Sequence, residues 1–270
     1  MNGAVRLAVL GDPLAFTRSP ELHRAGLAAL GIAGDSRALR TPKDQLATRL
    51  RDLAEEGVRG VNLTHPLKEC VLPLLERVSD GARRARSVNT VGLDPGGWWG
   101  ETTDGPGFLD LLRALSREPR EERAMLLGAG GAARSLAVAL ADAGAEPPVL
   151  SARAPDRARD ALAGEAARLV AWRSSEEHEA LARATLIVNA TPLSNPADLL
   201  PPVRIGRGVL LVDLTYGEAL TPWVVNARHA GIEAIDGLGL LVFQARRSLA
   251  HWLHHEVPLE PLTAAVGWPR

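Results

Sequence analysis

The sequence predicts an α/β protein, and three observations carry this prediction. Short apolar runs alternate with helical patterns from one end of the 270 residues to the other, which is typical of α/β folds. The length fits one large domain or two of ordinary size. Hydrophobic residues make up 46% of the chain and charged residues 23%, which is normal for a protein with a sizeable core.

The first half of the chain predicts strands alternating with helices. Residues 5–10 are apolar except for Arg6 and predict a strand that ends at Gly11-Asp12-Pro13. Ser19 is the expected N-cap of a helix that runs to Leu30, with Pro20 in its first turn. The later elements expected here are strands at 35–39 and 60–64, helices at 44–56 and 67–78 (the second kinked or restarted at Pro73), and a hairpin of 89–91 with 98–100 around the turn 94–97.

The second half predicts a parallel sheet that is covered on both faces, because its strands are continuously apolar. Its expected strands are 124–127, 148–151, 186–189, 209–213 and 232–235, with a helix from the glycine-rich loop to Ala143. A helix near residues 104–115 is expected to join the halves. The expected domains are therefore 1–104, with 241–270 packing back on it, and 105–240.

Charge and cysteine content exclude several classes of function. The formal net charge is −1, so we expect no nucleic-acid partner and no binding to an anionic membrane. A single cysteine, Cys70, excludes an intramolecular disulfide and a cysteine-cluster metal site. No apolar run approaches the roughly 20 residues of a membrane span, and the first ten residues lack the pattern of a signal peptide, so we expect none. We expect a cytoplasmic protein.

Lysine is scarce. It occurs only at Lys43 and Lys68, and the rest of the 31 basic residues are arginine. Arginine cannot give up its proton, whereas lysine can. The bias therefore singles out Lys68, while Lys43 lies in a polar helix start and is expected to be an ordinary solvated charge.

The glycine-rich loop predicts a nucleotide site. Gly128, Gly130 and Ala133 follow an apolar strand and open a helix, which is the context that the dinucleotide fingerprint requires. Gly128 allows the tight turn, Gly130 admits a pyrophosphate, and Ala133 permits close packing of helix and strand. The alternative is a glycine-rich turn without a ligand.

The next strand favours NADP(H) over NAD(H). Folds that bind NAD place an acidic residue at the end of this strand, where it binds the ribose 2′-hydroxyl. Here Arg153 follows the strand and Arg157 comes four residues later. Guanidinium groups suit a 2′-phosphate. The alternative is that both are surface charges in an arginine-rich chain.

Polar clusters end the short strands of the first half, at residues 62–68, 87–90 and 100–104. Side chains at strand ends fit a cleft in an α/β domain. Lys68 could pass a proton or stabilise an alkoxide, with Asp104 orienting it. From spacing alone, each residue also has a structural explanation as a cap or a solvated charge.

Seven short segments occur in a particular order along the chain. They are Thr17 to Pro20, Asn62 to Lys68, Val88 to Thr90, Thr102 to Gly107, Gly128 to Ala133, Asn189 to Pro192 and Gly237 to Gln244. In the same order they resemble the motifs S-x-S-P, N-[VL]-T-x-P-x-K, A-V-N-T, N-T-D-x-x-G, G-A-G-G-A-[AG], N-A-T-[SP] and G-x-x-M-L-x-x-Q of the shikimate dehydrogenase family. The resemblance covers nearly the whole chain.

The resemblance implies a fold, a reaction and a set of roles. The family has an N-terminal α/β substrate domain, an NADP-binding Rossmann domain and C-terminal helices that return to the first domain. It interconverts 3-dehydroshikimate and shikimate with NADP(H), and it carries no metal. Lys68 and Asp104 match its catalytic pair. The substrate-binding matches are Thr17, Ser19, Thr64, Asn89, Thr103, Tyr216 and Gln244. The expected cofactor-binding residues are Gly128, Ala129, Gly130, Gly131, Ala132, Arg153, Arg157, Thr191 and Gly237.

Several positions depart from the family pattern. Thr17 replaces the first serine of S-x-S and adds a methyl group to the expected carboxylate pocket, and one methyl is worth only ~1–3 kcal/mol in specificity. The other departures are Phe16 for histidine, Thr102 for asparagine, Ala152 and Ala154 beside Arg153, Ser194-Asn195 for Gly-Met, Glu218 for proline and Leu240 for methionine.

Three interpretations stay open after the departures. The first is a shikimate dehydrogenase of aromatic amino acid biosynthesis. The second is a divergent member that prefers quinate or aminoshikimate. The third is a non-catalytic regulator that binds NADP or a metabolite. The expected partner is a small carboxylate substrate, and the expected assembly is a monomer or a homodimer.

Overall fold

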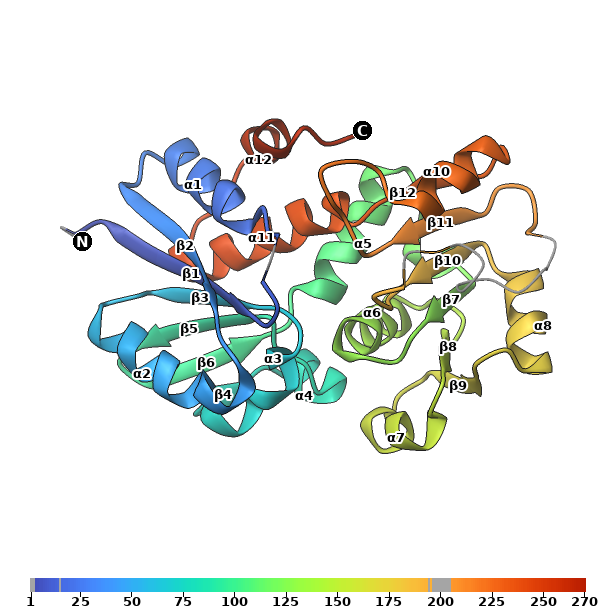
Figure 1. Ribbon diagram of the computed structural model, residues 1–270, viewed down its shortest axis with the longest axis horizontal. Coiled ribbons are helices and arrows are strands. Elements are labelled where there is room, and N and C mark those ends of the chain that lie inside the picture. The colour runs from blue at the N-terminus through green and yellow to red at the C-terminus, as the bar shows by residue number, and fades with distance from the viewer. Residues whose placement is uncertain (1–2, 15, 194, 196–204) are drawn as a thin grey trace. The chain divides into compact units, whose positions relative to one another are not determined.

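The computed structural model describes residues 3–14, 16–193, 195 and 205–270. The chain divides into two compact units: Met1–Gly107 with Leu241–Arg270, and Phe108–Leu240. Each unit has its own six-stranded sheet with helices packed on it (Figure 1). The α/β class is therefore confirmed. The two unit boundaries fall inside helices α5 (Asp104–Ala114) and α11 (Leu238–Leu253).

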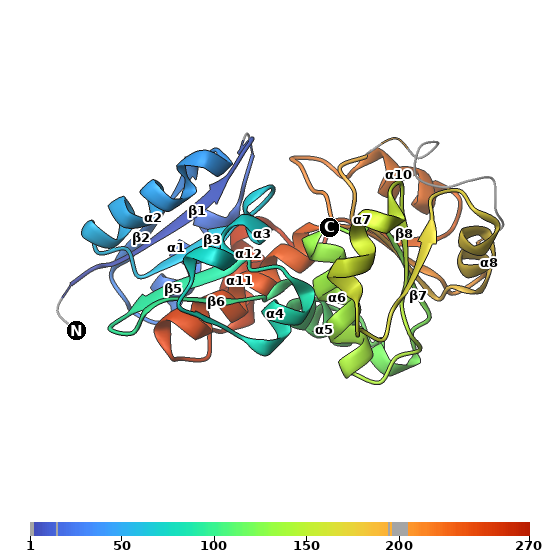
Figure 2. The same cartoon turned by 90° about the horizontal axis from the view of Figure 1, so that it is seen from below.

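The sheet of the first unit has the order β2-β1-β3-β5-β6-β4. Its strands are β1 (Val5–Gly11), β2 (Gly34–Arg40), β3 (Gly60–Leu63), β4 (Arg77–Val78), β5 (Thr90–Asp94) and β6 (Gly97–Glu101). Only β5 runs opposite to the other strands, as the middle of an antiparallel β3-β5-β6 arrangement. The end of β3, the start of β5 and the end of β6 consequently meet at one edge of the sheet. The β5–β6 hairpin can be followed in Figure 2.

Helices cover both faces of this sheet. They are α1 (Ser19–Ala29), α2 (Leu46–Glu55, after the 3₁₀ turn Lys43–Gln45), α3 (Leu67–Cys70), α4 (Asp80–Ala85), α11 and α12 (Leu259–Val266). One core joins Leu46, Leu50 and Leu53 of α2 to strand residues Ala8 and Val61.

Helix α11 packs against β3, where a Cβ atom on Gly60 would lie 2.4 Å from the Trp252 ring. The Arg18 guanidinium at the start of α1 donates hydrogen bonds to the Ala265 and Val266 carbonyls of α12, both at 3.1 Å. The C-terminal helices therefore return to the first unit, as the resemblance implied.

Two local expectations in this unit are wrong. Ser19 does not cap α1: Arg18 occupies the N-cap position, without a side-chain capping bond, and Ser19 is the first helical residue. The Ser19 amide instead lies 3.3 Å from the Thr17 hydroxyl. The helix expected over 67–78 is also broken. It consists of α3, the 3₁₀ turn Leu72–Leu74 and strand β4, because Pro73 offers no backbone N–H to continue a helix.

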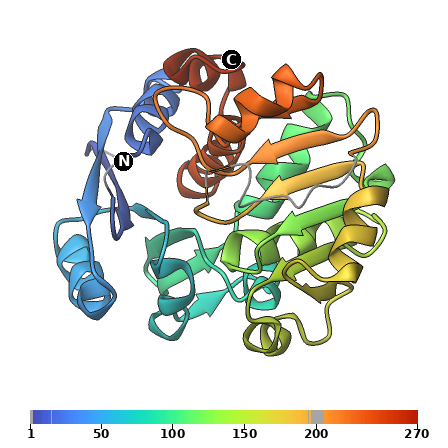
Figure 3. The same cartoon turned by 45° about the vertical axis from the view of Figure 1, so that its right-hand side comes forward.

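The sheet of the second unit is wholly parallel, in the order β12-β11-β10-β7-β8-β9. Its strands are β7 (Ala124–Leu127), β8 (Val149–Ala152), β9 (Arg168–Ala171), β10 (Leu186–Asn189), β11 (Leu210–Asp213) and β12 (Glu233–Ile235). Figure 3 shows β10 and β11 side by side, running in the same direction. This is the doubly wound Rossmann order, whose switch point lies between β7 and β10.

Among the described residues, the helices of this unit are α6 (Gly131–Asp142), α7 (Pro155–Arg159), α8 (Ser175–Arg183) and α10 (Pro222–His229), together with most of α5. β10 and β11 are buried at every position, which is the burial that their continuous apolar runs predicted. Neither β9 nor α7, α8 and α10 was predicted from the sequence. β9 escaped notice because only Val170 of its four residues is buried.

Candidate active site

The structure brings Lys68 and Asp104 together. Lys68 lies in α3, directly after β3, and Asp104 is the first residue of α5, after β6. The Lys68 Nζ atom is 2.6 Å from Asp104 Oδ2, and the two side chains are 19% and 4% exposed. The Lys68 carbonyl accepts the Val88 amide at 2.9 Å, which ties α3 to the segment before β5. A partly exposed ammonium that is held by a buried carboxylate can exchange a proton with a bound ligand.

Asn89 uses the other oxygen of Asp104. Its Nδ2 atom donates to Asp104 Oδ1 at 2.9 Å and to Gln244 Oε1 at 2.6 Å. The amide N–H of Thr103 donates to Asn89 Oδ1 at 2.7 Å. Both oxygens of Asp104 are thus engaged, one by Lys68 and one by Asn89. The result is a cluster of one ammonium, one carboxylate and two amides at a single edge of the sheet.

Gly107 explains how Gln244 reaches this cluster. A Cβ atom at Gly107 would lie 2.8 Å from the backbone nitrogen of Gln244 and 3.0 Å from its Cα. Only a residue without a side chain lets α5 approach α11 so closely. The glycine that closes the segment 102–107 therefore sets the position of an amide that contacts Asn89.

The hydroxyl groups expected to bind the substrate carboxylate lie together. Thr17 Oγ1 is 3.3 Å from Ser19 Oγ, and Ser19 is 5% exposed. Thr64 is half-buried at the end of β3, and a Cβ atom on Gly11 at the end of β1 would come within 2.4 Å of its methyl carbon. The hydroxyl that survives at Thr17 is thus placed beside that of Ser19, while its neighbour Phe16 is 44% exposed.

His23 contributes to this region although no sequence pattern indicated it. His23 is fully buried and bonds Asn62 Oδ1 through Nε2 at 2.9 Å and Ser36 Oγ through Nδ1 at 2.8 Å. Burial lowers the pKa of His23 to about 4; the hydrogen bond to Asn62 opposes this shift and Arg24 adds to it. A single histidine in an amphipathic helix gives no sequence signal that it will bond to Asn62. Asn62 itself belongs to the family-like segment 62–68.

The depressed pKa of His23 predicts a loss of stability in acid. The native state holds His23 neutral down to about pH 4, whereas the ordinary pKa of histidine is 6.5. The unfolded chain therefore binds the extra proton first as the pH falls, and stability is lost between these two values. We expect this group to cost roughly 3 kcal/mol of unfolding free energy between pH 7 and pH 4.

Chemical denaturation of the wild type and of His23→Gln at both pH values measures this loss. The variant removes the titrating group, so its unfolding free energy should depend less steeply on pH than that of the wild type. Equal pH dependence in the two proteins would contradict the assignment.

The glycine loop of the second unit has room for an anion. Gly128 has a φ of 111°, and a Cβ atom there would lie 3.1 Å from the Ala190 carbonyl oxygen, so the turn requires glycine. Gly130, the N-cap of α6, has no atom within 4 Å of where its Cβ would be, and no side chain caps the helix. The start of α6 is thus free of a side-chain cap and has open space beside Gly130, and a helix N-terminus of this kind suits a pyrophosphate. These residues fit a dinucleotide.

The other residues expected to contact the cofactor or the substrate in the second unit lie mainly after its strands. Thr191 follows β10 and is oriented by Asn189 Oδ1, which accepts its amide at 2.9 Å and its hydroxyl at 2.7 Å. Arg153 follows β8 and is exposed. The Arg157 side chain and Ser194 lie outside what the structure describes. Tyr216 is half-buried after β11. Gly237 is buried, where a Cβ atom would lie 2.2 Å from the Leu214 carbonyl oxygen, so close backbone packing alone accounts for this glycine.

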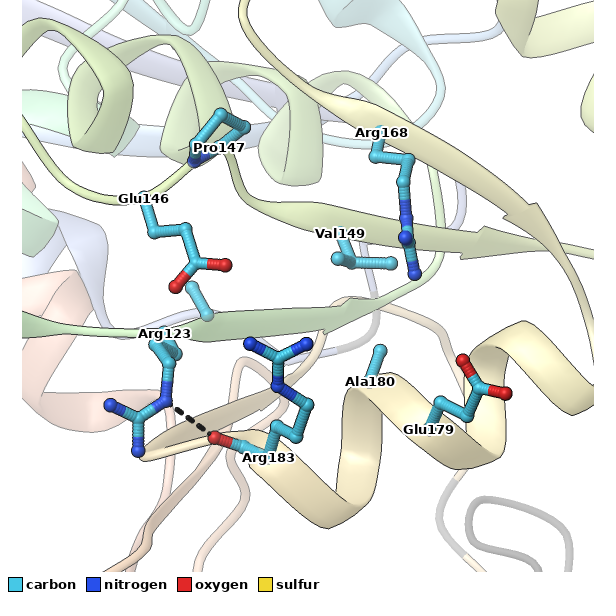
Figure 4. A pocket seen from close by; sticks show the side chains of 9 residues that line it. Arg123, Glu146, Pro147, Val149, Arg168, Glu179, Ala180 and Arg183 are labelled. Atoms are coloured by element: carbon cyan, nitrogen blue, oxygen red, sulfur yellow. Dashed lines mark hydrogen bonds between the residues drawn. The ribbon is translucent and has the colours of Figure 1, made fainter.

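A separate pocket of about 200 Å³ lies in the second unit, at the opposite edge of the sheet from the glycine loop (Figure 4). Its floor includes Val149 and Ala180, and Arg168, Arg183 and Glu146 stand around it. Arg123 also lines the pocket, and its Nε atom donates to the Arg183 carbonyl at 2.7 Å, at the end of α8. In doubly wound sheets, ligands bind at the carboxyl ends of the strands. This pocket lies at their amino ends and is not the candidate cofactor site.

Metal sites and membrane spans are both absent from the part of the chain that the structure describes. It contains no group of three or more histidine, cysteine, aspartate or glutamate side chains that could hold a metal ion. None of its helices is long and apolar enough to cross a membrane.

The chain matches known proteins over nearly its full length. Residues 9–91 match the family model for the shikimate dehydrogenase substrate binding domain. A shikimate dehydrogenase (NADP(+)) from Acidiphilium cryptum is 41% identical over 258 residues, which is 93% of this chain and 92% of the relative. One from Xanthomonas euvesicatoria is 40% identical over 270 residues, covering 97% and 95%.

A solved structure agrees with these sequence matches. The shikimate 5-dehydrogenase of Thermus thermophilus, in complex with NADP(H) and shikimate, superposes with a TM-score of 0.84 at 35% identity. The match covers 97% of this chain and 98% of that one.

Proposed function

The chain belongs to the shikimate dehydrogenase family, and from this premise we propose that it catalyses the NADP-dependent, reversible reduction of 3-dehydroshikimate to shikimate. The observation that carries the proposal is the 2.6 Å contact between Lys68 and the buried Asp104. Asn89 and Gln244 adjoin this pair. The cluster offers both a proton donor and neutral partners for ring hydroxyls.

The protein's own groups handle the proton and the substrate. NADPH, when bound, supplies the hydride that adds to the C3 carbonyl carbon. Lys68 stabilises the negative charge that develops on the carbonyl oxygen and then donates a proton to it, giving the C3 hydroxyl. Asp104 holds the ammonium in place through Oδ2. In the reverse direction, Lys68 takes the hydroxyl proton.

The remaining residues of the cluster hold the substrate. Asn89, Asp104 and Gln244 are assigned to the ring hydroxyls, while Thr64 and Thr103 line the same site. The Thr17 and Ser19 hydroxyls are assigned to the carboxylate, and their 3.3 Å separation supports this assignment because one carboxylate oxygen can accept from both. Tyr216 is assigned a position near the substrate.

The second unit is assigned to the cofactor. Residues 128–132 would hold the pyrophosphate, which is supported by the room at Gly130 and the uncapped start of α6. Thr191 and Gly237 are assigned to the same cofactor. Arg153 and Arg157 would hold the 2′-phosphate.

Replacing Arg153 by alanine should weaken NADP⁺ binding more than NAD⁺ binding. The guanidinium would interact with the 2′-phosphate, which NAD⁺ lacks, so only the KM for NADP⁺ should rise. We expect a rise of about tenfold, since a charge-assisted hydrogen bond is worth ~1.5–3 kcal/mol when buried and less at this exposed site. Steady-state kinetics with each cofactor measures the effect, and Arg168→Ala, at the other sheet edge, is the control. Equal changes for both cofactors would contradict the phosphate role.

Substrate choice within the family is the finer question, because Thr17 adds a methyl group beside Ser19. The test is the set of specificity constants for shikimate, quinate and aminoshikimate, each with NADP⁺ and NAD⁺. We expect shikimate with NADP⁺ to have the highest value. A preference for quinate or aminoshikimate would identify the divergent enzyme, and ligand binding without turnover would identify the regulator.

We also propose the functional division of the chain and its setting. Residues 1–104 with 241–270 form the substrate-binding part and residues 105–240 the dinucleotide-binding part. The protein is proposed to act in the cytoplasm as a monomer or homodimer, and sedimentation velocity distinguishes these two states.

A further inference from the structure

A buried chain of polar side chains runs from helix α1 to the candidate active site. It begins at Ser36 of β2, whose hydroxyl lies 2.8 Å from His23 Nδ1. His23 Nε2 lies 2.9 Å from Asn62 Oδ1 on β3. All three side chains are at most 5% exposed. Burying so many polar groups is costly unless their partners have a defined arrangement.

Asn62 connects these side chains to Asn89, which lies directly before β5. Its Nδ2 atom donates to the backbone carbonyl of Asn89 at 2.9 Å. It also lies 3.1 Å from Ser248 Oγ and 3.2 Å from Thr90 Oγ1. These two hydroxyls are 2.7 Å apart and are both fully buried. One amide thus links β3, β5 and α11.

The hydroxyl pair continues to the residues around Asp104. Ser248 donates to the Gln244 carbonyl at 3.0 Å and lies 3.2 Å from the Thr103 hydroxyl. Thr103 precedes Asp104, and its amide holds Asn89 Oδ1. Asn62 shares the Asn89 carbonyl with the Leu63 amide, which donates to it at 2.9 Å, and the Asn89 amide donates to the Glu101 carbonyl at 3.2 Å. Asn62 thus adds one hydrogen bond to this backbone, while the Thr103 amide holds the Asn89 side chain, whose Nδ2 atom donates to Asp104.

The Asn62 amide is oriented from both ends, by the His23 ring at its oxygen and by the Asn89 carbonyl at its nitrogen. Its oxygen faces the ring, so Nε2 must carry a proton and Nδ1 must accept from Ser36. If the amide turned over, its oxygen would face the Asn89 carbonyl, which is also an acceptor, and the contact would be repulsive. The His23 ring is held by the edge-on ring of Trp252, at a centroid distance of 5.3 Å. Arg24 is the neighbouring charge, and with burial it keeps the ring neutral.

We propose that His23 is a positioning residue for the active site: it orients Asn62, whose amide adds a hydrogen bond to the Asn89 carbonyl and contacts the Thr90–Ser248 hydroxyl pair, and it thereby helps to keep the Asn89 side chain aimed at Asp104. This inference rests on the proposed function for its effect on catalysis. The positioning itself is a property of the first unit and can be measured without substrate.

Two variants of His23 separate positioning from simple packing. His23→Leu removes the donor to Asn62, whereas His23→Gln keeps an amide N–H that can reach the same oxygen. We expect His23→Leu to lower kcat/KM for shikimate about 10- to 100-fold, since small displacements of catalytic groups cost this much. The KM for NADP⁺ should stay unchanged, and His23→Gln should restore most of the loss. A folded His23→Leu protein with wild-type kcat/KM would overturn the proposal, as would equal losses in the two variants.

If His23→Leu does not fold, a pair of serine variants tests the same proposal. Ser248 and Ser87 are both fully buried in the first unit, and the Ser87 hydroxyl has no partner among the described residues. Ser248→Ala should lower kcat/KM for shikimate, whereas Ser87→Ala should leave it unchanged. Equal activity in the two proteins would overturn the proposal.

The side-chain amide resonances of Asn89, observed by NMR without substrate, distinguish the positioning role from the proposed function. They should shift in His23→Leu and return towards wild type in His23→Gln. Unchanged resonances would overturn the positioning role whatever the substrate is. A wild-type protein that does not oxidise shikimate would instead overturn the proposed function and leave the positioning role intact.

Discussion

Replacing Lys68 by alanine should lower kcat by roughly 10²- to 10⁴-fold, because a positioned proton donor contributes about this much. The KM for shikimate should change far less, since the Thr17, Ser19, Asn89 and Gln244 contacts assigned to the substrate remain. Steady-state kinetics in both directions measures the effect, with thermal unfolding to confirm that the variant folds.

The chain supplies its own control for this experiment. Lys43, the only other lysine, is exposed in a 3₁₀ turn of the same unit. Lys43→Ala should retain full activity. Near-normal turnover in Lys68→Ala would remove Lys68 from the chemistry, and Lys68→Arg tests the type of charge. Arginine keeps the positive charge but cannot give up a proton at ordinary pH, so we expect it not to rescue turnover.

Replacing Asp104 by asparagine should lower kcat by about 10²-fold or more. The carboxylate accepts from Lys68 Nζ through one oxygen and from Asn89 Nδ2 through the other. An asparagine has only one oxygen, so either Lys68 or Asn89 must face the new NH₂ group, donor against donor. The ammonium also loses the charge that holds it.

Asp94 provides the matched substitution. It is a partly exposed carboxylate of the same unit, paired with Arg77 at 2.6 Å, and Asp94→Asn should leave kcat unchanged. An Asp104→Asn enzyme with wild-type turnover would contradict the pairing.

The pattern of apolar residues and the positions of glycine and proline in the sequence predicted most of the fold. The continuous apolar runs of β7, β10 and β11 indicated the parallel sheet, and the Asp94–Gly97 turn indicated the hairpin. Elements with weak apolar patterns escaped: β9 buries only Val170, and the two-residue β4 has no pattern to find. Ser19 was misplaced as a cap because a helix start is set by local backbone geometry, which the Ser-Pro pair alone does not fix.

The sequence predicted the main residues of the candidate site but not the contacts that support them. Lys68 and Asp104 come from separate segments, and their position in ordered motifs made them candidates, which spacing alone could not do. The structure shows that the two side chains meet. The supporting contacts could not be predicted in this way. His23 and Ser248 are single residues in ordinary amphipathic helices, and only the folded chain shows that both meet Asn62. Gly107 belongs to the family-like segment 102–107, but only the structure explains why glycine is needed there: α5 and α11 approach too closely for a side chain.

The most direct test of the proposed reaction uses shikimate that carries deuterium on the carbon bearing the C3 hydroxyl, mixed with the wild-type protein and NADP⁺. We predict that NADPH forms with deuterium on its nicotinamide ring, because that carbon loses its hydride to the cofactor. Nicotinamide reduced without the label, or no reduction at all, would contradict the proposed reaction.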